Sequence, residues 1–232
     1  MSRGGQTRVS KTRSIPKPNE YIRQLYGEFK SFAFDEERAP ELKGHWRKVA
    51  FGVDLPIAMD LEIGTGNGYH FAHRALEYPE RFLIGLELKY KPLIQTIRRA
   101  VKCGCQNAKV ARYNAVLVNE LFAEEEIDHV FIHFPDPWSK LRQHKHRLLR
   151  REFLLRLYAI QRPGSFVDFK TDNREYFDWA MDHIKESPYR IEAQTRDLHR
   201  SPYAAENFVT QFEGLFIRQG LPICYVRLRK PL

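Results

Sequence analysis

The residues best suited to hold a nucleotide-like ligand follow the apolar segment 57–63. Three glycines at the spacing G-x-G-x-G come directly after it: Gly64, Gly66 and Gly68. Glycines at alternate positions let a backbone turn tightly and approach a ligand. The dinucleotide fingerprint is G-x-G-x-x-G, and its last position is Tyr69 here. Glu62 precedes the glycines, and a carboxylate there would repel a pyrophosphate but attract a cationic ammonium group. The pattern therefore favours S-adenosylmethionine over a dinucleotide.

Two further polar residues follow the next apolar segments. Glu87 ends the segment 81–87, about 20 residues past the glycines, where a carboxylate can accept hydrogen bonds from both ribose hydroxyls. Asn114 follows the segment 108–112, and its side chain could accept from an adenine amino group and donate to a ring nitrogen. The alternative interpretations are a solvated strand end for Glu87 and a turn-forming residue for Asn114.

The segment 134–147 combines an acid, an aromatic ring and a basic run. Asp136 stands between Pro135 and Pro137, which restrict the backbone and preorganise one carboxylate. Trp138 offers a flat surface on which a base can stack. Side chains suited to phosphate contact follow: Lys140, Arg142, His144, Lys145, His146 and Arg147. The segment therefore indicates contact with nucleic acid, and a rigid, solvated surface loop is the alternative.

Length, charge and cysteine content limit the class of protein. The 232 residues suffice for one α/β domain, and the net charge of +9 points to a polyanionic partner. Three cysteines, an odd and low number, predict a reducing compartment. No segment approaches the roughly 20 apolar residues that span a bilayer, and no signal peptide is visible. We expect a soluble, cytoplasmic protein with no membrane partner. Cys103 and Cys105 could form half of a metal site, but because no second cysteine or histidine pair has zinc-like spacing, we expect no metal.

A regular alternation of strands and helices must position these residues. Apolar runs predict strands at 57–63, 81–87, 108–112, 127–134, 165–171, 189–195 and 223–228. Helical periodicity predicts helices from Pro92 onward (with Ile94, Ile97 and Val101 buried), at 147–160 (with Arg147, Arg150 and Arg151 together on one basic face), and at 69–78, 174–185 and 208–219. This order predicts an α/β fold with a doubly wound, mostly parallel, seven-stranded sheet and helices on both faces. Ligands of such sheets bind at the carboxyl ends of the strands.

The N-terminal residues have a different composition. Residues 1–19 contain five lysines and arginines and no acid, which predicts a disordered basic arm. Residues 20–52 mix aromatic and charged side chains and predict an N-terminal helical extension. We therefore expect a single domain over residues 20–232.

Several separated motifs, in a fixed order, resemble one family. They are Phe134-Pro-Asp-Pro-Trp138 with the His-Lys-x-Arg run after it, Leu61–Gly64, Ile84–Glu87, Phe169–Asp172, Asp197–His199 and Thr210–Glu213. From about residue 20 to the C-terminus the chain resembles the bacterial, single-chain tRNA (guanine-N7-)-methyltransferases. The resemblance implies a class I methyltransferase (Rossmann-like) fold and S-adenosyl-L-methionine as cofactor. It also implies methyl transfer to N7 of a guanine, guanine(46), in the variable loop of tRNA.

The resemblance further implies roles for individual residues. Asp136 falls on the family's catalytic aspartate. Cofactor-binding positions match Glu62, Glu87, Asn114 and Asp136, to which the residue pattern adds Gly64, Gly66 and Gly68. Substrate-binding positions match Lys140, Asp172, Thr210, Gln211, Phe212 and Glu213. The RNA-contacting segment matches Arg142, His144, Lys145, His146 and Arg147. The implied partner is tRNA, with no obligatory protein partner, and the chain could be a monomer or a homodimer.

The chain departs from the family pattern at four positions. Asn114 replaces the usual Asp, which keeps an acceptor but removes a charge. Ser139 replaces a proline, Leu141 a basic residue and His146 an arginine, so the basic loop is weaker than usual. None of these changes removes a residue that the chemistry requires.

Guanine N7 carries a lone pair and no proton, so the reaction needs alignment and charge stabilisation rather than a base. We expect Asp136 to stabilise the developing purinium, with Asp172 and Glu213 as further acceptors. Lys140, Arg142, Lys145, Arg147 and Arg150 would hold the tRNA backbone.

Three other functions stay open from the residues alone. They are an NAD-dependent dehydrogenase, a non-catalytic RNA-binding protein, and a methyltransferase that acts on another RNA, a protein or a small molecule. The glycine spacing argues against the first, and the set of acids argues against the second. The basic charge favours RNA over the other methyl acceptors.

Overall fold

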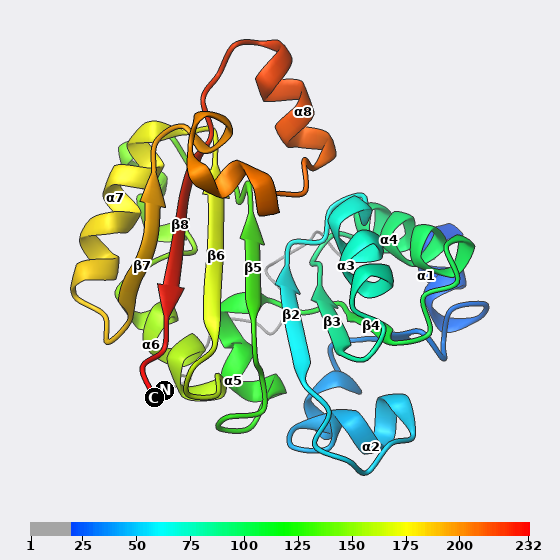
Figure 1. Cartoon of the computed structure of the whole chain (residues 1–232). Coiled ribbons are helices and arrows are strands. Elements are labelled where there is room, and N and C mark those ends of the chain that lie inside the picture. The colour runs from blue at the N-terminus through cyan, green and yellow to red at the C-terminus, as the bar shows by residue number, and fades with distance from the viewer. Residues whose placement is uncertain (1–19) are drawn as a thin grey trace. The chain divides into compact units, whose positions relative to one another are not determined.

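The computed structural model describes residues 20–232, so the basic arm predicted at 1–19 lies outside the described residues. The chain forms two compact units (Figure 1). The first ends at Ala123, and the second runs from Glu124 to Leu232. Each unit has its own strands, helices and core.

The first unit has a parallel four-stranded arrangement in the order β1-β4-β3-β2. Its strands are β1 (Ala33–Phe34), β2 (Met59–Ile63), β3 (Phe82–Leu86) and β4 (Ala108–Ala111). Its α-helices are α1 (Glu20–Tyr26), α2 (Trp46–Phe51), α3 (Tyr69–Glu77), α4 (Tyr90–Lys102) and α5 (Val118–Leu121). Two 3₁₀ turns, η1 (Ala39–Leu42) and η2 (Ala115–Leu117), complete it. Every residue of β2 and β3 is buried, as parallel strands covered by helices require.

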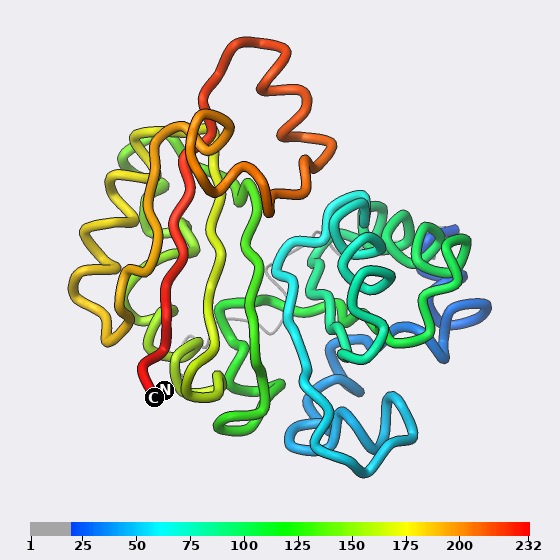
Figure 2. Tube along the Cα trace, in the orientation of Figure 1, coloured from blue at the N-terminus to red at the C-terminus, as the bar shows by residue number. Residues whose placement is uncertain are grey.

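The second unit is mixed, with strand order β5-β6-β8-β7. Its strands are β5 (Val130–His133), β6 (Phe166–Thr171), β7 (Arg190–Thr195) and β8 (Cys224–Arg229). β5 and β6 are parallel, whereas β8 runs antiparallel to both β6 and β7. Its helices are α6 (Arg151–Ile160), α7 (Arg174–Lys185) and α8 (Gln211–Arg218), with 3₁₀ turns η3 (Leu141–His146), η4 (Leu198–Arg200) and η5 (Pro202–Glu206). Figure 2 shows the chain passing from β6 through α7 and β7 before β8 returns between β6 and β7.

The described residues form eight strands rather than the predicted seven, because the N-terminal extension supplies β1. β1 pairs with β4 through Ala33 and Phe34. A strand of two residues is too short to show an alternating pattern, so no sequence pattern predicted it. The remaining seven strands lie within the predicted ranges, apart from the last, which extends one residue further to Arg229.

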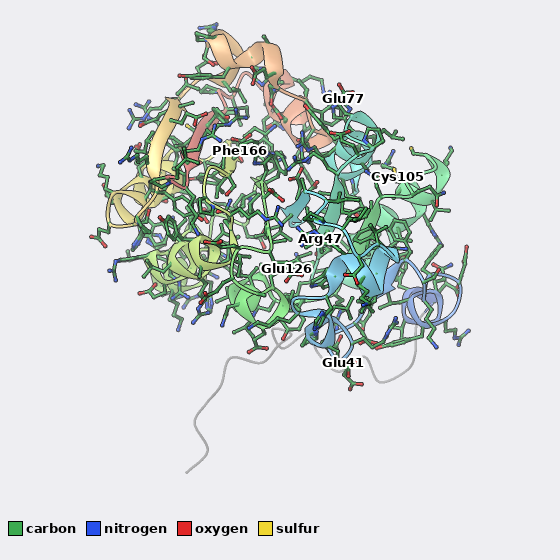
Figure 3. The ribbon with its side chains drawn as sticks, turned by 60° about the horizontal axis from the view of Figure 1, so that its bottom comes forward. Glu41, Arg47, Glu77, Cys105, Glu126 and Phe166 are labelled. Atoms are coloured by element: carbon green, nitrogen blue, oxygen red, sulfur yellow. The ribbon has the colours of Figure 1, made fainter. Side chains whose placement is uncertain are left out.

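The extension is anchored in the core of the first unit. The Trp46 indole of α2 is fully buried and donates to the Leu121 carbonyl at 2.8 Å. It packs edge-on against Phe34 of β1. Arg47, labelled in Figure 3, donates to the Ile57 carbonyl just before β2. The extension therefore buttresses the strand that leads to the three glycines.

Two helices differ in detail from their predictions. α4 begins at Tyr90, and its buried stripe includes Leu93 and Ala100, while Val101 is 52% exposed. Val101 lies about 100° around the helix from Ala100, which turns it away from the core. α6 begins at Arg151 rather than at residue 147, because Arg150 is extended and serves as its N-cap.

Among residues 20–232, no helix combines the length and the apolar character that a membrane crossing demands.

Trp46→Phe should destabilise the chain by about 2–3 kcal/mol, because it leaves the buried Leu121 carbonyl without its donor and opens a gap beside Phe34. Urea unfolding measures the change. Val49→Ala, on the exposed face of the same helix, is the matched control and should cost well under about 1 kcal/mol. Equal effects of the two substitutions would show that the extension is not part of the core.

Candidate active site

The three glycines after β2 all adopt the left-handed backbone conformation. Their φ angles are +78° at Gly64, +56° at Gly66 and +74° at Gly68. Gly68 is also the point of closest helix packing, since a Cβ there would lie 2.6 Å from the Thr96 Cα of α4. The third glycine of this loop thus allows close packing one position earlier than in the dinucleotide fingerprint.

Side chains of α4 hold the glycine loop in place. Thr96 Oγ1 donates to the Gly66 carbonyl at 3.0 Å and lies 2.9 Å from Thr65 Oγ1. Arg99 donates to the Asn67 carbonyl, and its guanidinium stacks over the Tyr69 ring at 3.4 Å. The loop is therefore fixed from its carbonyl side, which leaves its conformation preorganised.

Glu62 has a partner that sequence reasoning missed. Its Oε2 lies 2.7 Å from Nδ1 of His70, in the first turn of α3, and both side chains are buried. A histidine at the start of the helix that follows the glycines was the available signal, because the strand–loop–helix turn brings the two together. The pair orients the carboxylate at the end of β2.

Glu87 joins β3 to the glycine loop. Its Oε2 accepts from the Gly66 amide at 3.2 Å and its Oε1 from the Lys89 amide at 2.9 Å. Burial raises the pKa of Glu87 above the ordinary 4.5, and the backbone hydrogen bonds oppose that shift. The side chain therefore sits beside the glycines, as its predicted role requires.

Asn114 lies half-buried after β4 and caps η2. Its Oδ1 accepts from the Val116 amide at 3.1 Å. The side-chain oxygen of Asn114 therefore stabilises a turn, and its amide nitrogen is the group that distinguishes it from the Asp of the family pattern.

Nearby, the buried Arg112 donates to the Leu88 carbonyl and to both Glu36 carboxylate oxygens. No sequence pattern singled out Arg112. This residue connects Glu36 of the N-terminal extension with Leu88, the residue after Glu87.

In the second unit, Asp136 lies in a loop with strained backbone at both ends. Phe134 and Trp138 have φ angles of +52° and +47°, a conformation that costs non-glycine residues about 1–3 kcal/mol each. The Phe134 amide donates to the Lys170 carbonyl at 2.8 Å. Asp136 itself is exposed. The two prolines and the two strained residues thus present one carboxylate in a restricted position.

The basic run after this loop divides into exposed and buried members. The exposed side chains are Lys140, Arg142, Lys145 and His146. His144 is half-buried, with Nε2 3.9 Å from Glu175. Arg147 is only 1% exposed and forms a two-pronged ion pair with Glu175, so it does not lie on the exposed face predicted for it. The expectation of one basic helical face formed by Arg147, Arg150 and Arg151 is wrong, because η3 turns Arg147 inward before α6 begins.

Asp172 follows β6 directly and precedes Asn173, whose Oδ1 caps α7 through the Tyr176 amide. Burial raises the pKa of Asp172 above its ordinary value. A carboxyl group that is partly withdrawn from water beside a helix start suits an acceptor for a polar ligand edge.

The stretch 210–213 starts α8 with a capping box. Thr210 Oγ1 accepts from the Glu213 amide, and Glu213 Oε2 accepts from the Thr210 amide. The Glu213 carboxylate is fully buried and also receives Lys170 Nζ at 2.8 Å and Asn207 Nδ2 at 2.7 Å. Both of its oxygens thus accept hydrogen bonds from the protein itself. Glu213 therefore stabilises the start of α8 and its contact with β6. Gln211 and Phe212, between them, are exposed.

The chain is similar along most of its length to a tRNA (guanine-N(7)-)-methyltransferase of Bdellovibrio bacteriovorus. The two are 53% identical over 206 residues, which cover 89% of this chain and 99% of that protein. The chain belongs to the tRNA (guanine-N(7)-)-methyltransferase family. A member from Lachnoclostridium phytofermentans is 34% identical over 211 residues, 91% of this chain and 94% of its own. A family model described as "Putative methyltransferase" matches residues 58–226.

Solved structures agree with this family's fold. A 16S rRNA methyltransferase, KamB, has a TM-score of 0.55 at 15% identity over 75% of this chain and 88% of its own. A 16S rRNA (adenine(1408)-N(1))-methyltransferase of Catenulisporales acidiphilia, in complex with its cosubstrate, has a TM-score of 0.52 at 14% identity over 75% and 85%. At such identities the likeness shows the fold alone, and it confirms the predicted class I methyltransferase fold.

Gly68→Ala should destabilise the chain more than Gly52→Ala does. Both glycines have positive φ, so each substitution carries a strain of about 1–2 kcal/mol, but only Gly68 also meets backbone atoms of α4. Urea unfolding should show the difference, and calorimetric titration should show weaker S-adenosylmethionine binding for Gly68→Ala alone. Identical stabilities and affinities for the two variants would contradict the role of close packing.

Affinity for S-adenosylmethionine should fall with decreasing pH, with a midpoint above 4.5. In the role predicted for Glu87, its charged form would accept hydrogen bonds from the ribose hydroxyls, and burial raises the pKa at which that form is lost. Because its pKa is raised on folding, Glu87 takes up a proton at a higher pH in the folded chain than in the unfolded chain. Its contribution to the free energy of unfolding therefore becomes more favourable as the pH falls, while the cofactor affinity decreases. Titration calorimetry at several pH values should show that Glu87→Gln binds S-adenosylmethionine weakly and with an affinity that does not change with pH. If the affinity of Glu87→Gln fell with decreasing pH as that of the wild-type chain does, Glu87 would be excluded as the source of the pH dependence.

Proposed function

We propose that this chain transfers the methyl group of S-adenosylmethionine to N7 of a guanine in the variable loop of tRNA. The observation that carries the proposal is the exposed Asp136 carboxylate, restricted by prolines and strained residues, beside the exposed cations Lys140, Arg142 and Lys145. The membership of the chain in the tRNA (guanine-N(7)-)-methyltransferase family supports the choice of tRNA and of N7.

The first unit carries groups that fit S-adenosylmethionine. Its glycine loop is flanked by the carboxylates of Glu62 and Glu87, which would repel a pyrophosphate but suit an ammonium group and ribose hydroxyls. Glu62 would hold the ammonium group, Glu87 the ribose hydroxyls and Asn114 the adenine edge. When bound, S-adenosylmethionine supplies an electrophilic methyl group on a sulfonium.

The second unit carries groups that fit an RNA base and backbone. Because guanine N7 has no proton to lose, the residues need only orient the base and stabilise the positive charge that develops on it. Asp136 serves this purpose, and Asp172 provides a second acceptor for the N–H groups of the guanine edge. Trp138 and Phe212 offer partly exposed rings on which bases can stack.

The exposed cations Lys140, Arg142 and Lys145 contact the phosphates of the tRNA in this proposal. Such contacts release counterions, so tRNA affinity decreases steeply with salt concentration. The slope of the logarithm of the binding constant against the logarithm of the salt concentration becomes more negative by about one for each phosphate neutralised. The finer choice between tRNA and another RNA rests on the family and is decided by the methylated product.

Asp136→Asn should lower the rate of methyl transfer by about 100-fold or more while tRNA binding is retained, because the amide keeps the size but loses the charge. Transfer from labelled S-adenosylmethionine to unmodified tRNA, followed by nucleoside analysis, measures the rate and identifies the product. Asp178→Asn, which removes a surface ion pair with Arg196, is the control and should leave the rate unchanged. Normal turnover of Asp136→Asn would exclude the proposed role, and methylation of ribosomal RNA in place of tRNA would favour the alternative substrate.

A further inference from the structure

We propose that Arg147 is a positioning residue that holds the Asp136 loop, and that it does not bind RNA phosphates. The loop meant here is residues 134–138. The inference rests on the proposed function, since that function gives Asp136 its catalytic task.

The Arg147 guanidinium joins the loop to α7 through three hydrogen bonds. Nε donates to the Pro137 carbonyl at 2.8 Å. Nη1 and Nη2 donate to the two Glu175 carboxylate oxygens at 3.0 and 2.6 Å. This two-pronged arrangement is the geometry in which arginine binds carboxylates most specifically. The hydrogen bond from Arg147 holds the pKa of Glu175 below its ordinary value, so the pair is ionised at neutral pH.

Aromatic side chains of α7 complete the seat of the guanidinium. Its carbon lies 5.0 Å from the centre of the Trp179 ring and 5.2 Å from that of Tyr176. The Tyr176 hydroxyl accepts from the amides of Leu148 and Leu149, directly after Arg147. The arginine and the two residues after it are therefore attached to the same stretch of α7.

The composition of the loop explains why it needs such a donor. Pro135 and Pro137 have no N–H, so this stretch of backbone has few donors of its own. Phe134 and Trp138 hold conformations that persist only where the surroundings determine them. The Phe134 amide is tied to the Lys170 carbonyl at one end. At the other end, Arg147 supplies the hydrogen bond to Pro137, one residue after Asp136.

The neighbouring cations differ from Arg147 in their exposure to solvent. Arg142 and Lys145 are exposed, whereas the Arg147 side chain has no exposed surface. A phosphate could reach Arg147 only by displacing Glu175 and the loop carbonyl. The basic run therefore contains cations for the RNA and one cation for the loop.

The test compares Arg147→Lys and Glu175→Gln with Lys145→Ala, which removes a proposed phosphate contact, and with the control Lys185→Ala on the exposed face of α7. Arg147→Lys keeps the charge but loses the fork, and it should lower the methyl-transfer rate at saturating tRNA at least tenfold with an unchanged salt dependence of tRNA binding. Glu175→Gln should lower the rate in the same direction and to a smaller extent. Lys145→Ala should weaken tRNA binding and reduce the salt slope by about one, whereas Lys185→Ala should leave both the methyl-transfer rate and the salt slope unchanged.

Hydrogen exchange of the Phe134 amide, which donates to the Lys170 carbonyl, gives a readout that does not depend on activity. Both Arg147→Lys and Glu175→Gln should speed this exchange, and Lys145→Ala should not. If Arg147→Lys fails to fold, Glu175→Gln still decides the question. A reduced salt slope for Arg147→Lys with its saturating rate intact would overturn the inference, and so would unchanged exchange in both variants. Failure of the wild-type chain to methylate any tRNA would instead overturn the proposed function.

Discussion

Left-handed backbone at the carboxyl ends of two strands is the constraint on which both units depend. After β2, three glycines meet it without steric cost, and Gly68 also lets α4 approach. After β5, Phe134 and Trp138 meet it with side chains that disfavour it. The first turn is therefore stable through its composition, whereas the second needs hydrogen bonds from elsewhere, such as the one from Arg147. The two solutions differ because a glycine loop can cradle a ligand with its backbone, while the second loop has to present a side chain.

Several buried charges among residues 20–232 are paired, and the pairs determine which acids remain available. Asp60 on β2 receives the guanidinium groups of Arg74 and Arg81, and Glu213 receives Lys170. Removing one partner of such a pair leaves an uncompensated charge, so each pair constrains the elements that it joins. The Lys170–Glu213 pair connects β6 with the start of α8. Of the acids that the sequence singles out in the second unit, Asp136 is the one that points to solvent.

The sequence predicted what depends on local composition. The helix Arg174–Lys185 was predicted at its observed bounds, because Asn173 caps its first turn and its apolar residues repeat with helical periodicity. Interactions between distant residues were not predictable in this way. The pairing of Glu62 with His70 and that of Arg147 with Glu175 depend on how a turn or a helix packs, which one sequence does not reveal. The start of α6 was predicted wrongly for the same reason.

Charge content illustrates this limit most clearly. A sequence counts each lysine and arginine equally, and the net charge of +9 indicates a polyanionic partner. Folding then sorts the cations by their neighbours. Arg147 lies against Trp179 and Glu175, where its charge is neutralised within the protein, while Arg142 remains in solvent. Under the proposed function, the basic run of this chain therefore contains two groups, one that attracts the RNA and one that holds the acid in position, because attraction without a fixed carboxylate would bind tRNA but not orient its guanine.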